Sequence, residues 1–449
     1  MFIPLVVLSQ SWQKSYDITP SFFDNIADIG HSIKETNDGG YILLSSSGAM
    51  HNIWIVKIQN NGNIQWEKNN YGSFPSPTDI QQTSDGGYVF CGGYDYAWLI
   101  KTDMFGNVTW NNTYDNLANE RVYSVKETLD GGYVACGRSG NGSVTDAYVI
   151  KTDINGDTLW TRTFGSSTYF DVTHSILQSS DGGYAICGTT DNPVTDQDVW
   201  LIKTDMYGDT IWTKSYNSVD TVTFWDTQGW HTIAVHGSDI GYSVKQTNDG
   251  GYIITGTTTL SPGIVNSNGS FFGEYSFLIK TDGNGDLVWM EYYGSSNSHM
   301  ISSNSVEQTN DGGYIFTGSC DPYISNNYSA YLIKTDINGS QECMRTYSTI
   351  HTNSNHDATG NSVRNTSDGG YIMIGKTQGI PPEVASDIFV VKVDSNGPCI
   401  STSFPNINRV TRRLLKVTDV LGREVNKKRN TPLFYIYNDG TVEKKIIIK

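Results

Sequence analysis

The sequence predicts an all-β protein, a seven-bladed β-propeller of four-stranded blades closed by its N-terminal strand, followed by a small C-terminal β-domain. Three observations carry this prediction. A tetrapeptide recurs, a second phrase similar to LIKTD follows each copy, and the chain opens with a phrase that its last repeat lacks. The tetrapeptide DGGY begins at Asp38, Asp85, Asp130, Asp181, Asp249, Asp311 and Asp368. A repeat of this length predicts one supersecondary unit per copy, stacked on its neighbours.

Each repeat contains four short strands. In residues 243–294, SVKQT and YIITGTT are separated by NDGG, and YSFLIKT and LVWMEYY by DGNGD. Runs rich in β-branched and aromatic residues, bounded by Gly, Asn and Asp, indicate strands joined by hairpins. Seven four-stranded units favour a closed propeller, with a linear β-solenoid as the alternative.

The N-terminus supplies the strand that completes the ring. The last repeat stops at SNGPCI (395–400), before its fourth strand, whereas WQKSYD at 12–17 nearly repeats WTKSYN at 212–217. Residues 11–17 are therefore expected to complete the seventh blade, which removes an exposed sheet edge. The predicted domains are a signal-peptide remnant (1–10), the propeller (11–400), a linker (401–409) and a C-terminal domain (410–449).

A tryptophan recurs after the second hairpin of several repeats. The phrase TDxxGxxxW stands intact at 102–110, 152–160, 204–212 and 281–289, and resembles the tryptophan-docking motif of quinoprotein propellers. The resemblance implies that its tryptophans pack between neighbouring blades: Trp110, Trp160, Trp212 and Trp289. Those quinone-dependent enzymes often carry adjacent cysteines, which this chain lacks, so no cofactor is expected. The carboxylates of DINGD (153–157) favour a hairpin turn over a calcium loop, and no metal is predicted.

The cysteines fall into two groups. Cys91, Cys136 and Cys187 occupy the same second-strand slot of successive repeats, which indicates a core position. Cys320, Cys343 and Cys399 lie outside that slot and could pair in an oxidising compartment, with the partners left open.

Charge separates the chain into two parts. Residues 405–449 carry 11 Lys and Arg against 4 Asp and Glu, a net of +7, and the remainder carries 19 against 42, a net of −23. Such acidity argues against nucleic acid, whose phosphates require a basic face. It favours a soluble extracellular surface over recognition of cations or basic partners. No segment is long and apolar enough to span a membrane.

The basic tail has a recognisable pattern. It contains DVLGRE at 419–424, FYIYNDG at 434–440 and a terminal KKIIIK, and is similar to the C-terminal sorting domain of Bacteroidota type IX secretion. The whole chain thus resembles secreted Bacteroidota DGGY-repeat propellers. The resemblance implies the type IX secretion machinery as a partner, and a location that is secreted or on the outer cell surface. An ordinary small β-domain is the alternative.

Long insertions concentrate binding candidates on one face of the disc. They span 217–241, 259–274, 294–304 and 347–361, all on the face opposite the tight DGGY turns. Loops held on a rigid scaffold are the usual place for binding groups. Seven residues of the first two insertions could form a stacking platform for a sugar ring, or pin their loops to the disc: Phe224, Trp225, Trp230, His231, His236, Phe271 and Phe272.

The expected function is binding or adhesion, with polysaccharide or a surface protein as the ligand. The alternative is an extracellular glycoside hydrolase, since resembling sequences are sometimes labelled endoglucanase-like. Hydrolysis requires two carboxyl groups about 5 to 9.5 Å apart. Candidates on the insertion face are Asp220, Asp226, Asp239, Glu274 and Asp357, and no motif pairs them. A structural role in a surface layer is a third possibility.

Overall fold

The computed structural model describes most of the chain in two units. The described residues are 11–16, 27–48, 52–69, 71, 74–115, 119–141, 144–165, 169–192, 196–226, 229–259, 274–294, 299–321, 328–347, 357–378, 386–394, 414–418, 423, 432–437 and 442–446. The first compact unit is Met1–Ile400 and the second is Ser401–Lys449. The predicted signal-peptide remnant and linker lie outside the described residues.

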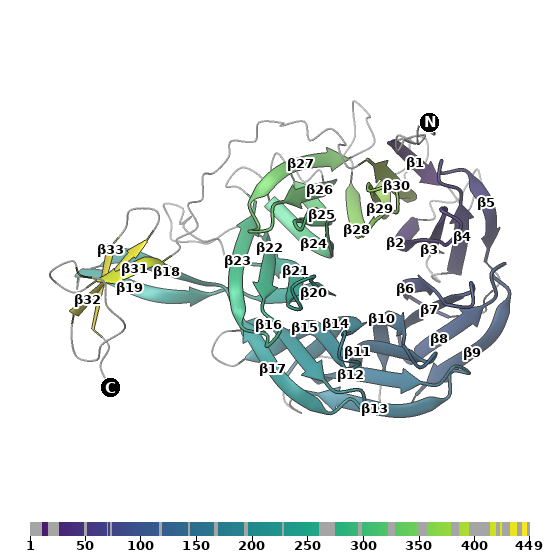
Figure 1. The fold of residues 1–449 in the computed structure, drawn as a ribbon, viewed down its shortest axis with the longest axis horizontal. Helices are drawn as coiled ribbons and strands as arrows, with labels where there is room; N and C mark the ends of the chain where they lie inside the picture. Colours follow the sequence, from purple (N-terminus) through teal and green to yellow (C-terminus); the bar gives the residue numbers. More distant parts are fainter. Residues whose placement is uncertain are drawn as a thin grey trace, which may run out of the picture. The chain divides into compact units, whose positions relative to one another are not determined.

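Seven antiparallel four-stranded sheets are arranged around a central axis, so the predicted propeller is confirmed. In Figure 1 the first strand of each blade lies innermost and the fourth lies at the rim. Blades 1 to 3 comprise β2 (Asp28–Glu35), β3 (Tyr41–Ser47), β4 (Asn52–Ile58) and β5 (Ile64–Lys68); β6 (Pro77–Gln82), β7 (Tyr88–Gly93), β8 (Ala97–Thr102) and β9 (Val108–Tyr114); and β10 (Arg121–Glu127), β11 (Tyr133–Asn141), β12 (Val144–Thr152) and β13 (Thr158–Phe164).

The remaining blades repeat the same order of strands. Blades 4 to 6 comprise β14 (Asp171–Gln178), β15 (Tyr184–Asn192), β16 (Asp196–Thr204) and β17 (Thr210–Tyr216); β20 (Asp239–Gln246), β21 (Tyr252–Thr258), β22 (Tyr275–Thr281) and β23 (Leu287–Tyr293); and β24 (His299–Gln308), β25 (Tyr314–Asp321), β26 (Ser329–Thr335) and β27 (Gln341–Tyr347). Blade 7 comprises β28 (Ala358–Asn365), β29 (Tyr371–Gln378), β30 (Ser386–Val393) and the N-terminal β1 (Trp12–Tyr16).

The N-terminal strand closes the ring as the sequence predicts. β1 pairs antiparallel with β30, from Trp12 opposite Lys392 to Tyr16 opposite Ile388. The two ends of the propeller therefore meet in one sheet, and β30 has a partner on both edges. An unpaired edge at this place would offer a template for another chain.

In each blade, the aspartate of DGGY pairs with a lysine near the end of the third strand. In blade 2, Asp85 accepts hydrogen bonds from Thr83 Oγ1 (2.5 Å) and Gly87 N (2.9 Å). Its Oδ2 also pairs with Lys101 Nζ at 2.8 Å. A Cβ at Gly87 would lie 2.1 Å from a backbone carbonyl of the third strand, so only glycine fits there. The same Asp–Lys pair occurs in all seven blades.

The docking tryptophans pack against the next blade, which confirms their structural role. The ring of Trp212 in blade 4 lies 6.2 Å, centroid to centroid, from that of Tyr252, the tyrosine of DGGY in blade 5. It also covers Gly285 in the TDxxG turn of blade 5, where a Cβ would approach the indole to 2.7 Å. Trp110, Trp160 and Trp289 make the same contacts with their own neighbours. The motif thus links one blade to the next.

The buried apolar side chains form one cluster at each interface between neighbouring blades. Cys91, Cys136 and Cys187 are fully buried in them as free thiols, as predicted. Cys343 is disulfide-bonded, whereas Cys320 is a buried free thiol.

Two further elements stand outside the blades. A hairpin of β18 (Val219–Asp226) and β19 (Gly229–His236) separates β17 from β20. The second unit contains a three-stranded sheet of β31 (Leu414–Thr418), β32 (Pro432–Tyr437) and β33 (Val442–Ile446). Within the described residues, no helix meets the length and apolarity needed to cross a membrane.

Candidate functional site

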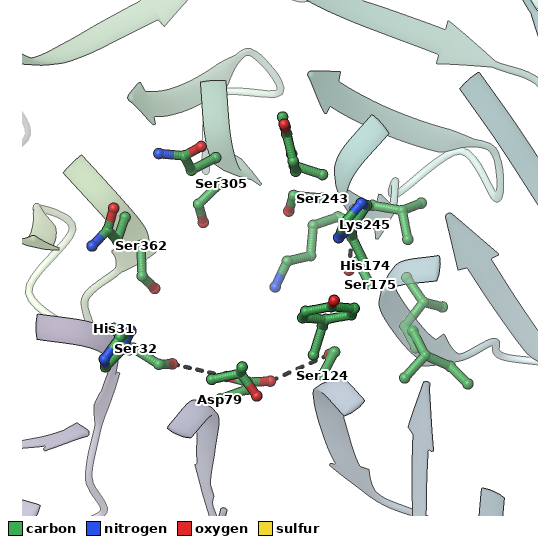
Figure 2. A pocket seen from close by; sticks show the side chains of 18 of the residues that line it. His31, Ser32, Asp79, Ser124, His174, Ser175, Ser243, Lys245, Ser305 and Ser362 are labelled. Carbon is green, nitrogen blue, oxygen red and sulfur yellow. Dashed lines mark hydrogen bonds between the residues drawn. The ribbon is translucent and has the colours of Figure 1, made fainter. Parts of the chain in front are cut away.

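The first strands of all seven blades line a pocket in the middle of the propeller. Its volume is about 120 Å³. Figure 2 shows side chains from these strands around the opening, with Asp79 bonded to its neighbours on both sides. Each first strand runs from the inter-blade connection to its DGGY turn. Residues early in these strands are therefore nearer the face that carries the long loops.

A β-bulge in each first strand shapes the entrance of this pocket. At an equivalent position of every blade, the pairing with the second strand skips one residue. In blade 6 a second shift occurs earlier in the strand, between Met300 and Ser302. Such a bulge redirects a side chain out of the regular alternation. The seven residues skipped at the equivalent position all line the pocket and are partly exposed, and we call them the mouth ring: His31, Thr78, Tyr123, His174, Tyr242, Asn304 and Asn361.

Three neighbouring members of the mouth ring form an aromatic arc. The ring centroid of His174 lies 5.2 Å from that of Tyr123 and 5.1 Å from that of Tyr242. Burial, with a smaller contribution from Arg138, lowers the pKa of His174 to about 4. Burial also raises the pKa of Tyr242. His174 and Tyr242 are therefore uncharged near pH 7, and the three rings of the arc can offer both apolar faces and polar edges to a ligand.

Directly after the mouth ring, six blades place a serine where blade 2 places Asp79. The serines are Ser32, Ser124, Ser175, Ser243, Ser305 and Ser362. Several tie neighbouring blades together, because Ser175 Oγ accepts from Val244 N at 3.3 Å and Ser243 Oγ from Val306 N at 3.4 Å. Ser362 differs, since its Oγ is buried without a hydrogen-bond partner among the described residues. Most of this ring is structural.

Asp79 joins the serine ring to two lysines. Its Oδ1 accepts from Ser32 Oγ at 2.8 Å and pairs with Lys34 at 3.3 Å. Its Oδ2 pairs with Lys126 at 2.8 Å. Burial alone would raise the pKa of Asp79, but Lys126 and then Lys34 hold it well below its usual range. Asp79 is therefore an ionised acceptor near pH 7 and does not serve as a proton donor.

Two residues after the serine ring, the first strands carry an excess of positive charge. This position holds Lys34, Gln81, Lys126, Leu177, Lys245, Glu307 and Arg364, which we call the cation ring. Its four cationic side chains face two carboxylates, Asp79 and Glu307, which leaves a formal local charge of +2. Lys245 pairs with Glu307 at 2.7 Å, and Arg364 with Glu307 at 3.3 Å. The centre of this propeller is thus cationic although the chain as a whole carries −16.

Burial of several cations at the centre lowers the stability of the fold. Burial, and then repulsion from Arg364, lowers the pKa of Lys34 well below its usual value. Burial likewise lowers the pKa of Lys245 despite Glu307. The arrangement suits hydrogen bonding to polar or anionic groups. Among the residues that the structure describes, no cluster of three or more His, Cys, Asp or Glu could hold a metal ion.

The predicted aromatic candidates of the first insertion lie on the hairpin. Trp225 and Trp230 are Cα partners across β18 and β19, as are Phe224 and His231. His236 lies opposite Val219 at the base of the hairpin. Phe271 and Phe272 fall outside the described residues. The backbone brings the two tryptophans together, and the stacking platform stays a prediction.

The carboxylates proposed for hydrolysis lie in different environments, some buried and some exposed. Asp239 is fully buried and accepts from Ser218 N at 2.5 Å and Ser218 Oγ at 2.8 Å. Burial raises its pKa to about 6. Its carboxyl group secures the connection between the hairpin and blade 5 and does not face a ligand. Glu274 and Asp357 are exposed, and Asp220 and Asp226 lie on β18.

Sequence reasoning centred on the loops missed the residues of the pocket. An alignment of the seven first strands would have revealed them, because one column reads almost entirely serine and another holds four cations. Arg364 is one member of that column, although the arginines look scattered when they are considered without the lysines.

Comparisons with known proteins find only distant structural likenesses. No protein-family model matches the chain, and no curated protein matches it. A protein of unknown function from Bacteroides caccae matches at 10% identity, covering 72% of this chain and 94% of that one, with a TM-score of 0.37. Chaetomium thermophilum Sqt1 bound to the N-terminus of ribosomal protein L10 matches at 11% identity, with 80% and 82% covered and a TM-score of 0.47. A PL25 ulvan lyase matches at 11%, with 82% and 91% covered and a TM-score of 0.46. At these identities and TM-scores the matches carry no information about ligand or activity.

Proposed function

We propose that this propeller is a binding or adhesion module that is secreted or displayed on the cell surface, with a polysaccharide or a surface protein as its ligand. One observation carries the proposal. The contacts that build the blades repeat around the ring, whereas the mouth ring changes from blade to blade. A variable set of polar and aromatic side chains on a repeating frame is typical of a ligand site.

The chemistry of the mouth ring favours a saccharide between these two ligands. Tyr123, His174 and Tyr242 supply adjacent rings for stacking, and Asn304 and Asn361 supply amide groups. A sugar offers apolar C–H faces and many hydroxyl groups, which match such a surface. The aromatic residues of the hairpin would extend the contact towards a longer polymer.

Export is part of the same proposal. The tail pattern within 410–449 resembles a type IX sorting domain, and residues 1–10 resemble the end of a signal peptide. The disulfide at Cys343 supports folding in an oxidising compartment. Fusing residues 405–449 to a periplasmic reporter in a Bacteroidota host tests this step. Reporter in the medium or on intact cells supports it, and reporter retained in the periplasm contradicts it.

A glycan and polysaccharide array probed with the full chain tests the binding function, with reducing-end release measured on every hit. Binding without release supports the proposal. Release would instead favour the glycoside hydrolase alternative. Absence of both, with binding to extracts of cell-surface protein, would favour the protein ligand.

The hairpin tryptophans are tested on the same array. Trp225→Ala or Trp230→Ala should abolish binding with an unchanged melting temperature if they form a stacking platform. A lower melting temperature would show instead that they pin the hairpin to the disc.

A further inference from the structure

We propose that the central channel binds a small oxyanion of about two negative charges, held by Lys126, Lys245 and Arg364 of the cation ring. The anion is either a free dianion such as sulfate or a pair of singly charged groups carried by a polysaccharide, such as a sulfate ester and a uronate. The inference does not require the proposed function, because a free anion alone would satisfy it.

The charge of the pocket wall is the first argument. Of its lining residues, Lys126, Lys245 and Arg364 are cationic and only Asp79 is anionic. Lys34 and Glu307 do not line the pocket, and their opposite charges cancel. The excess of about two positive charges is enclosed by protein, where the effective dielectric constant is lower than in water and charges interact more strongly. A dianion would neutralise this excess.

The hydrogen-bond donors of the pocket are the second argument. Lys245 Nζ has three protons and bonds within the described residues only to Glu307. Arg364 Nη1 donates to Ser305 Oγ at 2.9 Å, while its Nε is buried without a partner in the described part of the chain. Ser362 Oγ, in the same blade as Arg364, is also buried without one. Buried donors are normally satisfied, so unused donors beside an excess of positive charge indicate an acceptor of negative charge.

Lys126 plays a different part from Lys245. Its Nζ already bonds to Asp79 Oδ2, Ser124 Oγ and the Val125 carbonyl, at 2.8, 3.0 and 2.8 Å. It therefore contributes charge, whereas Lys245 and Arg364 contribute both charge and open donors. Lys245 is the residue whose replacement most directly tests the site.

The size of the pocket is the third argument. An apolar cavity of about 150 Å³ holds one benzene molecule. The pocket here, about 120 Å³, thus suits an ion of the size of sulfate or the charged end of a larger ligand that enters through the mouth ring. A whole polymer chain would not fit between the first strands.

Isothermal titration of the full chain with sodium sulfate, at ionic strength held constant with sodium chloride, tests the proposal. Wild-type protein should bind one sulfate per chain. Lys245→Gln should weaken the affinity about tenfold or more, because it removes a charged donor. Lys214→Gln is the matched control. Lys214 lies on the outer fourth strand of blade 4, is 39% exposed and pairs with Asp286. Equal affinity in all three proteins, or no binding to the wild type, would overturn the proposal.

Thermal unfolding separates a lost site from a lost fold. Sulfate stabilises proteins non-specifically, and this part of the shift should be the same in every variant. The specific part of the shift in melting temperature depends on the ratio of sulfate concentration to Kd. Only this part should disappear in Lys245→Gln. Without sulfate, Lys245→Gln should melt lower than the wild type, because it leaves the buried carboxylate of Glu307 paired with Arg364 alone among the described residues. A large fall in melting temperature together with an unchanged sulfate-dependent shift would show that Lys245 is structural only.

Competition identifies the source of the anion. If a sulfated polysaccharide or a polyuronate displaces sulfate from the wild type but its neutral counterpart does not, the anion belongs to the polymer. If only small anions compete, the channel holds a free ion. Binding of the neutral polymer alone, with no effect of sulfate, would contradict the anion site while leaving the binding function intact.

Discussion

The hydroxyl group of Tyr16 donates a hydrogen bond of 2.7 Å to the carbonyl of Gly62, and thereby ties the N-terminal strand of blade 7 to the second hairpin of blade 1. The same bond recurs between other blades, for example from Tyr114 to Gly156 at 2.8 Å. Tyr16 is also buried in the cluster shared by blades 7 and 1. Closure of the ring therefore uses a contact that also joins four other pairs of neighbouring blades.

Removing the N-terminal strand should sharply destabilise the propeller. Deletion of residues 11–17 leaves the edge of β30 unpaired and removes Tyr16 from the core. Tyr16→Phe, which keeps the ring, should cost about 1 kcal/mol. Urea unfolding measures both, with Tyr94→Phe as the exposed control. A deletion variant as stable as the full chain would mean that closure does not support the fold.

Truncating a docking tryptophan should cost far more than truncating its exposed neighbour. Trp212→Ala removes an indole that packs on Tyr252 and Gly285 of the next blade, and should destabilise by about 3 to 5 kcal/mol. Ile211→Ala, one residue earlier and 57% exposed, should change stability by less than about 0.5 kcal/mol. Chemical unfolding of the two variants compares them directly. Similar losses would rule out the docking role.

The Asp–Lys pairs predict a defined window of acid sensitivity. The hydrogen bonds to Asp38, Asp85, Asp249 and Asp311 hold their pKa values at about 2, below the ordinary 3.8, against the effect of burial. A lowered pKa in the folded state contributes stability above pH 3.8, and this contribution is lost as the pH falls through 2. Asp85→Asn should therefore flatten the fall in stability between about pH 4 and pH 2. Asp209→Asn, which removes an exposed ion pair with Arg162, is the control for the loss of a surface carboxylate.

Asp239 predicts a pH dependence of the opposite sign. Its folded pKa of about 6 lies above the ordinary 3.8 because the group is buried. A raised pKa in the folded state gives stability that is complete below pH 3.8 and is lost as the pH rises through 6. Asp239→Asn keeps a polar side chain without a charge, so its urea midpoint relative to wild type should rise between pH 4 and pH 7. A constant difference across that range would show that Asp239 does not titrate there.

The aromatic arc predicts a loss of binding without a loss of stability. Tyr123→Ala removes one face of the arc at a partly exposed position and should reduce affinity for any glycan hit at least about tenfold, the scale of one stacked ring. Tyr207→Ala, 61% exposed in a TDxxG turn on the other side of the disc, should leave affinity unchanged. Surface-immobilised titration of both variants makes the comparison. Equal affinities would exclude the mouth ring as the saccharide site.

The sequence by itself determined the repeat, the number of blades, the closing strand and the role of the tryptophans. It could do so because these features depend on local contacts that recur: Asp85 with Lys101 within a blade, and Trp212 with Tyr252 between neighbours. Each recurrence adds the same residues at the same spacing, and hairpin geometry then fixes the register.

Only the tertiary structure decided what lies at the centre. Lys34, Lys126, Lys245 and Arg364 are far apart in the chain and meet because ring closure turns one column of each first strand towards a common axis. Their pKa shifts depend on burial and on charges from other blades, which no local pattern reports. The tertiary structure also decided the role of Asp239, which is buried and bonded to Ser218, although in the sequence it is one of several acidic residues near a long insertion.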